Sequence, residues 1–282
     1  MRASKSTSSS TFDYSPAELK KLWERLHRGD REPWPDAKSI ARLAARNPEF
    51  AAELASKGGA QAVSEGLQGA WHEFHAGRFE RAIKQGDALG AIGAVAANKA
   101  AAIHSLTVRR GTAKRAELLQ AAVERGEASV KQLPNHPNAH YMLALALGRY
   151  SQDISILKAA ASGLATRVKN HLERTLALEP SHAEAHVALG LYHAEIIAKL
   201  GSLAAAFTYG ASKDRAVEHF RHAVKLAPAS PIVHIEYANG LLLLDPAGSR
   251  AAAEKLYAEA ASFEPIDAME QLDVERARRG PP

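Results

Sequence analysis

Four segments of this chain repeat one spacing of residues, and that repeat limits the fold more than any other feature. Each segment starts with a short side chain, has a second position four residues later, a third short one three beyond it, and a proline five further on. Such steps place the first three positions on one face of a helix, and proline stops a helix because it lacks an amide proton. The sequence therefore predicts helices that pack through one face and end before a proline. The four sets are Ala122, Gly126, Ser129, Pro134; Val168, Leu172, Thr175, Pro180; Ala216, Phe220, Ala223, Pro228; and Ala253, Tyr257, Ala260, Pro265.

Helix is predicted for nearly the whole chain. Apolar residues recur at steps of three and four, Ala, Leu, Glu, Lys and Arg are abundant, and no stretch alternates convincingly as a strand would. Ser15-Pro16-Ala17-Glu18 is a capping box with proline at the first helical position, and it predicts a helix to about His27. Prolines and a glycine pair between residues 33 and 59 then divide the chain into two short helices.

Upstream of three of the four segments lies another helix, which is the first of each pair. It has a large residue followed by a small one, at Leu147-Gly148, Leu189-Gly190 and Tyr237-Ala238. Residues 70–82 show a similar pattern, with a small residue, then a tight glycine turn, and then a phenylalanine ahead of Ala82. This pattern of paired helices resembles the tetratricopeptide repeat (TPR), in five units over roughly residues 60 to 265. The resemblance implies an all-α fold, an alpha-alpha superhelix in which helical hairpins stack into a solenoid with a concave surface.

Two units are longer than the TPR allows. The repeat expects about twelve residues between the short residues of its two helices, whereas Gly148 to Val168 spans twenty and Gly190 to Ala216 spans twenty-six. The larger insertion includes residues 201–210, which are too apolar for a free loop. We expect this segment to pack against the solenoid. Of two possible roles, we favour a plug that fills the groove over a gate that opens the groove to a ligand.

Units with such insertions resemble two specialised groups of repeat proteins, the TPR-like T component associated with TRAP transporters and the regulators of microtubule dynamics. We do not expect the periplasmic role of the T component, because Met1 to Tyr14 has no apolar signal region and the chain has no cysteine to carry a lipid. The expected regions are a disordered tip and helical N-terminal cap (1–58), the TPR-like repeat domain (59–265), and a C-terminal capping helix and tail (266–282).

Composition excludes several classes of site. Without cysteine the chain can form no disulfide, thiolate zinc site, iron–sulfur cluster or cysteine nucleophile. No stretch approaches the roughly 20 apolar residues that span a bilayer, so we expect a cytoplasmic protein with no membrane partner. The net charge is +5. For the densest run of basic residues, 109–115, we favour a solvated loop over a site for an anionic partner. With 6% aromatics and none in that run, a nucleic-acid partner is not expected.

Histidine is the one residue type that suggests metal chemistry. His182, His186 and His193 stand four and seven residues apart and share a helix face, which could hold a divalent metal in an enzyme. The TPR resemblance implies instead that His186 and His193 are interior, hydrogen-bonded side chains, and we favour that interpretation. Phosphate-binding loops, dinucleotide-binding motifs and nucleophile elbows are missing from the sequence. We therefore predict no enzyme, no cofactor and no metal.

The TPR resemblance also implies which first-helix residues face the concave side. Most of them are apolar, including Met142, Leu145, Leu191, Ile232 and Ile235, which disfavours a clamp for a charged carboxyl terminus. For the asparagines, a local hydrogen bond between helices competes with ligand contact. The predicted partner-binding groove consists of Asn98, Lys99, Tyr141, Arg149, Glu195, Tyr209 and Asn239.

These observations favour a non-catalytic scaffold that binds a helix or peptide of a partner protein in its groove. Two alternatives stay open: a TPR-like protein that binds a small molecule in an apolar cavity near Tyr150 and Tyr209, and a metal-dependent enzyme that uses the histidine face. Alanine-rich faces such as residues 251–253 also leave a homo-oligomer open.

Overall fold

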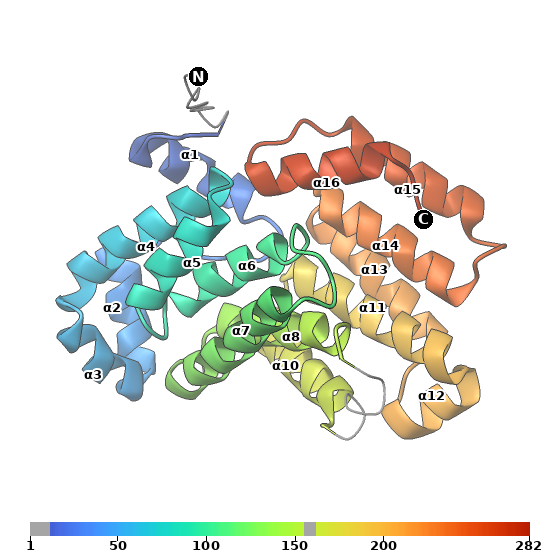
Figure 1. Cartoon of the computed structure of the whole chain (residues 1–282), viewed down its shortest axis with the longest axis horizontal. Helices are drawn as coiled ribbons and strands as arrows, with labels where there is room; N and C mark the ends of the chain where they lie inside the picture. The colour runs from blue at the N-terminus through green and yellow to red at the C-terminus, as the bar shows by residue number, and fades with distance from the viewer. Residues whose placement is uncertain (1–11, 155–161) are drawn as a thin grey trace.

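The computed structural model describes residues 12–154 and 162–282, and within these ranges it contains fifteen helices and no strand (Figure 1). The predicted all-α solenoid of helical hairpins is confirmed. Helices of each hairpin pack on each other and on the next hairpin. The five hairpins are α4 (Gly59–His75) with α5 (Phe79–Ala88), α6 (Ala94–His104) with α7 (Ala113–Gln132), α8 (Pro137–Ser151) with α10 (Leu164–Leu178), α11 (Ala183–Leu200) with α13 (Lys213–Leu226), and α14 (Pro231–Leu244) with α15 (Arg250–Ser262).

Five further helices flank or interrupt the hairpins. Three precede them, α1 (Pro16–Leu26), α2 (Ala37–Arg46) and α3 (Pro48–Ser56). The short α12 (Ser202–Tyr209) lies between α11 and α13, and α16 (Ala268–Arg278) follows the last hairpin. None of the helices in the described ranges is both long and apolar enough to cross a membrane.

Local sequence signals explain where helices begin and end. Ser15 accepts a hydrogen bond from the backbone of Glu18, and the Glu18 carboxylate accepts one from the backbone of Ser15, so the predicted capping box is complete. Pro134, Pro180, Pro228 and Pro265 follow α7, α10, α13 and α15 within three residues. Proline therefore separates successive hairpins as the repeat predicts.

Short side chains allow close approach at most, but not all, of the predicted positions. Ala122, Ala216, Ala223, Ala253 and Ala260 are at most 2% exposed. A Cβ at Gly190 would lie 2.5 Å from the Phe220 ring, so that glycine lets α13 reach α11. Among the described residues, no atom lies within 4 Å of a Cβ added at Gly148, in the corresponding place on α8. In the part of the chain that the structure describes, Gly148 therefore does not provide the close approach that Gly190 does.

The N-terminal region is more than a cap. Helices α2 and α3 pack on α4 at the start of the solenoid, but residues 27–35, between α1 and α2, enter the interior, where Asp30 is fully buried. The Tyr14 hydroxyl donates to the Ile266 carbonyl at 2.8 Å, and α1 and α16 lie on the same side of the molecule (Figure 1). Segments at the two ends of the chain thus meet. The predicted disordered tip lies almost entirely outside the described residues.

The apolar insertion does not plug the interior. Gly201 ends α11 at a φ of 75°, and the following α12 is attached through Ala205 and Ala211, which are at most 2% exposed. Leu203 and Phe207 point outward and are 90% and 96% exposed. Alanine therefore makes the contact between this segment and the solenoid, and Leu203 and Phe207 take no part in it. The shorter insertion falls largely on residues 155–161, which lie outside the described residues.

Candidate functional site

A cluster of buried polar side chains occupies the interior between the first helices of four hairpins and residues 27–32. The Lys99 ammonium on α6 forms ion pairs with Asp30 and, at 3.1 Å, with Glu184 on α11. The Glu184 amide donates to the Gly29 carbonyl at 3.0 Å. We call this cluster the polar centre; its members are His27, Asp30, Glu32, His75, Lys99, Asn138, Tyr141, His182, Glu184 and Asp267.

Asn138, on α8, connects residues 27–32 to α8 and α11. Its amide donates to the Asp30 carbonyl at 3.0 Å and to the Glu32 carboxylate at 2.5 Å. Its side-chain oxygen lies 2.8 Å from Nε2 of His182. Because Nδ1 of His182 accepts from the Ala185 amide, Nε2 carries the proton and donates to Asn138. Each polar side-chain atom of Asn138 and His182 therefore has a partner of the opposite kind.

A second arm runs from Asp30 to the C-terminal helix. Nδ1 of His27 lies 2.9 Å from Asp30, and Nε2 of His27 lies 3.2 Å from Nε2 of His75. Nδ1 of His75 lies 2.8 Å from the carboxylate of Asp267, which is the N-cap of α16. The polar centre therefore connects the N-terminal segment, the first helices of four hairpins (α4, α6, α8 and α11) and α16.

The electrostatics of the polar centre fit a closed ion-pair network. Burial opposes ionisation of Asp30, but His27 and Lys99 outweigh it and hold the pKa of Asp30 well below its usual range. Burial, reinforced by the Asp30 charge, raises the pKa of Glu32 to about 8. Burial lowers the pKa of His182 to about 4. The charges of Lys99 and Asp30 are paired in the interior, so they are not available to a ligand.

The structure separates the seven residues of the predicted groove. Lys99 and Tyr141 are buried in the polar centre. Asn98 donates to the Ala122 carbonyl at 2.9 Å and accepts from Arg125 at 2.7 Å, which joins α6 to α7. Asn239 accepts from the Tyr257 hydroxyl at 2.8 Å, which joins α14 to α15. Both asparagines therefore make a local hydrogen bond between the two helices of their hairpin, which is the alternative to ligand contact.

The remaining three predicted residues stay partly exposed. Glu195 on α11 pairs with Lys199 at 3.2 Å. Arg149 on α8 is half-buried, and among the described residues its Nε has no hydrogen-bond partner. Tyr209 ends α12, away from the polar centre. The segment that fills the interior, residues 27–32, was missed because a short charged run between helices reads as a solvated turn in the sequence.

The three histidines of the proposed metal face have separate partners. His182 caps α11, while Nδ1 of His186 lies 2.9 Å from Nδ1 of His219 and its Nε2 lies 3.1 Å from the Pro180 carbonyl. The ring of His193 stacks on His219. In the described ranges no group of three or more His, Asp or Glu side chains is placed to hold a metal ion.

The histidine contacts belong to the repeat. His140 on α8 lies 3.0 Å from His171 and 3.1 Å from the Pro134 carbonyl, which reproduces the His186 contacts one hairpin earlier. The basic run is structural in part as well, because Arg115 is 2% exposed and pairs with Asp153 at 2.5 Å.

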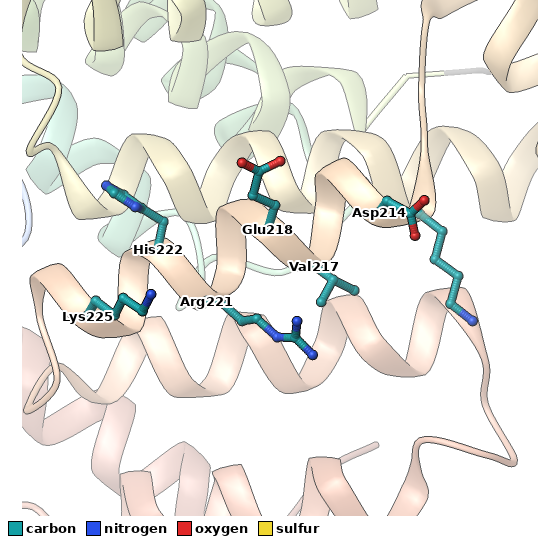
Figure 2. Close-up of a pocket in the computed structure, with 7 residues that line it drawn as sticks. Asp214, Val217, Glu218, Arg221, His222 and Lys225 are labelled. Carbon is teal, nitrogen blue, oxygen red and sulfur yellow. The ribbon is translucent and has the colours of Figure 1, made fainter.

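Two surface depressions lie away from the predicted groove. One runs along α13, where Glu218 and Arg221 leave the helix in different directions (Figure 2). Charges of both signs share this single helix, as on a solvated face. The other lies between the segment before α1 and α16, and includes Tyr14, Leu22 and Ile266. Neither depression includes Tyr150 or Tyr209, the residues named for a small-molecule cavity.

Comparison with known proteins identifies the family. A family model described as regulator of microtubule dynamics protein 1-3 (RMD1-3) matches residues 94–277, about two thirds of the chain. The chain belongs to the RMD1-3 family. This is one of the two specialised groups that the insertions suggested. The RMD1-3 match begins at α6 and ends within α16, so residues 27–32 lie outside it.

A solved structure shows the same fold as this RMD1-3 chain. The crystal structure of TTC0263, a thermophilic TPR protein in Thermus thermophilus, superposes with a TM-score of 0.54 at 18% identity. The similarity covers 77% of this chain and 100% of that chain, and it confirms the TPR-like fold. No curated protein matches.

Proposed function

We propose that this chain is a non-catalytic protein-interaction scaffold, and that it binds a helix or extended segment of a partner protein beside the polar centre. The observation that supports this is a set of partly exposed residues on α6, α8 and α11, beyond the polar centre. Residues at steps of three and four from Lys99, Tyr141 and Glu184 lie on the same helix faces as the polar centre, one to three turns further along. The open face consists of these residues, Ile103, Leu145, Arg149, Ala188, Leu191 and Glu195, together with Leu106 in the turn after α6.

The open face combines the properties of a peptide-binding surface. Every member is at least partly exposed, in contrast to the buried polar centre. Five members are apolar, and Arg149 and Glu195 add one charge of each sign. Apolar contacts supply affinity for an amphipathic helix or extended segment, and a few polar groups fix its orientation.

The family name makes tubulin the first partner to test. Purified full-length chain should co-sediment with microtubules or bind unpolymerised tubulin. The double variant Arg149→Glu, Glu195→Lys reverses both charges of the open face and should weaken binding at least about tenfold, or 1.4 kcal/mol. The matched control is Glu218→Lys, Arg221→Glu on the exposed side of α13, which should bind as the wild type does.

If tubulin does not bind, polypeptides retained from a lysate test the scaffold itself. Polypeptides that bind at the open face should not be retained by the Arg149→Glu, Glu195→Lys variant, but should still be retained by the Glu218→Lys, Arg221→Glu control. Equal binding by both double variants would contradict this location of the site.

A further inference from the structure

We propose that α12 docks the chain on an anionic lipid surface, with Leu203 and Phe207 inserted among the lipids and basic residues beside α12 facing the headgroups. This inference is independent of the open face, because α12 lies in the insertion between α11 and α13. It also gives a role to the apolar insertion, residues 201–210, which takes no part in the polar centre.

The two apolar side chains are unusually exposed. Leu203 and Phe207 are 90% and 96% exposed, whereas the other exposed large apolar side chains in the described ranges are between 38% and 49% exposed. They stand four residues apart, so they project from one face of α12. The helix Ser202–Tyr209 contains no charged residue. Contiguous exposed apolar surface of this kind indicates an interaction site.

The apolar pair is held in place on a fixed support. Ala205 and Ala211 are buried against the solenoid, and α12 packs along α11. Gly210, at a φ of 65°, closes the helix with its amide bonded to the Ala206 carbonyl, and the Ala211 amide bonds to the Ala205 carbonyl. Leu203 and Phe207 therefore project from an attached helix, with little conformational entropy to lose when they insert.

Basic residues precede and follow α12 in the chain, and one more lies near its C-terminal end. Lys199 precedes it, Lys213 and Arg215 follow it, and all three are exposed. Lys169 on α10 approaches Gly210. Glu195 and Glu173 partner Lys199 and Lys169 at 3.2 and 3.7 Å, and Asp214 is the third nearby acid. The side chains of Lys213 and Arg215 have no ion pair among the described residues, so they are available to an anionic surface.

The size of the apolar surface favours lipid over a second copy of the chain. A stable protein interface buries roughly 1,200–2,000 Å² in total. A phenylalanine and a leucine together present only on the order of 350 Å². Insertion into lipid needs no complementary pocket, and a small apolar anchor assisted by basic residues gives weak, reversible binding.

The test is flotation of the full-length chain with vesicles of phosphatidylcholine alone or with about one third phosphatidylglycerol. We expect binding to the anionic vesicles that weakens as salt is raised, and at least about a fivefold lower bound fraction for Leu203→Ser, Phe207→Ser. The matched control is Leu243→Ser, Leu272→Ser, which removes two other exposed leucines and should bind as the wild type does. Unchanged midpoints of urea unfolding would verify that both double variants fold.

Phe207→Trp gives a second measurement, because its added fluorescence should be quenched by brominated lipid tails. No binding to either vesicle, equal binding to both, or wild-type binding by the Leu203, Phe207 variant would overturn the proposal. A self-association in sedimentation velocity that this variant abolishes, without vesicle binding, would overturn it in favour of a second copy.

Discussion

At the scale of single residues, histidine caps two of the first helices. Nδ1 of His136 accepts from the Asn138 amide at 3.1 Å, and Nδ1 of His182 accepts from the Ala185 amide at 3.0 Å. An accepting nitrogen must be unprotonated, so both caps require a neutral imidazole. Burial lowers the pKa of both side chains to about 4.

These caps should make the fold sensitive to acid. The unfolded chain binds a proton at each histidine near pH 6.5, whereas the folded chain does so near pH 4, so stability falls as the pH drops between these values. The expected loss is up to roughly 3 kcal/mol for each histidine. Urea unfolding over this pH range measures it.

His182→Asn isolates the contribution of one cap. Asparagine keeps an acceptor at the N-cap but does not titrate, so the variant should lose less stability between pH 6.5 and 4. Glu32, whose pKa is raised to about 8, acts in the opposite sense in both proteins, and the comparison removes its contribution. A pH slope identical to that of the wild type would contradict this assignment.

Lys99 supplies the positive charge of the polar centre. Lys99→Met leaves Asp30 and Glu184 in the interior without their cation, and should lower the free energy of unfolding by about 3–5 kcal/mol. The matched control is Lys199→Met, which removes an exposed partner of Glu195 and should change stability by less than about 1 kcal/mol. Similar losses in the two variants would show that Lys99 has no special role.

At the scale of the helices, one aromatic side chain sets the packing of three elements. Phe220 on α13 is fully buried, and its ring occupies the space that a Cβ would need at Gly190 on α11 and at Gly240 on α14. Glycine is therefore required on both helices for α13 to pack between them.

Two glycine substitutions should have opposite effects. Gly190→Ala forces a methyl group against the Phe220 ring and should destabilise the fold by about 1–3 kcal/mol. Gly148→Ala adds a methyl group that meets no other described residue within 4 Å, and should stabilise the helix by roughly 0.5 kcal/mol. Thermal unfolding of the pair measures both signs, and destabilisation of equal size at the two positions would refute the packing argument.

At the scale of the whole molecule, contacts between distant segments hold the solenoid in one form. His75 on α4 and Asp267 before α16 are 192 residues apart and in contact at 2.8 Å. Arg28 after α1 pairs with Glu270 on α16. Because an ordinary solenoid unit contacts only its neighbours, these contacts couple regions that could otherwise open separately.

Asp267→Ala should expose this coupling. The substitution removes both the N-cap of α16 and the partner of His75, and should cost about 2–4 kcal/mol. Hydrogen exchange should accelerate in α16 and also in α4 and residues 27–32. Asp36→Ala removes a comparable cap at α2 and should accelerate exchange only nearby. Acceleration confined to α16 in the Asp267 variant would argue against coupling across the molecule.

The sequence by itself determined the helices, their limits and their pairing into hairpins. These features depend on contacts between residues close in the chain, such as the capping box at Ser15 and the prolines after α7, α10, α13 and α15. Tertiary structure decided the interior. Lys99 reads as a groove residue in its own hairpin, and only the folded chain brings Asp30, 69 residues earlier, into contact with it.

The same distinction explains the insertion. The sequence shows that residues 201–210 are apolar, but which of their side chains face the solenoid depends on how α12 lies against α11. Two alanines make that contact and leave Leu203 and Phe207 outside. Helical periodicity encodes which residues share a face, whereas contacts between distant segments depend on shape and charge that appear only when the hairpins have packed.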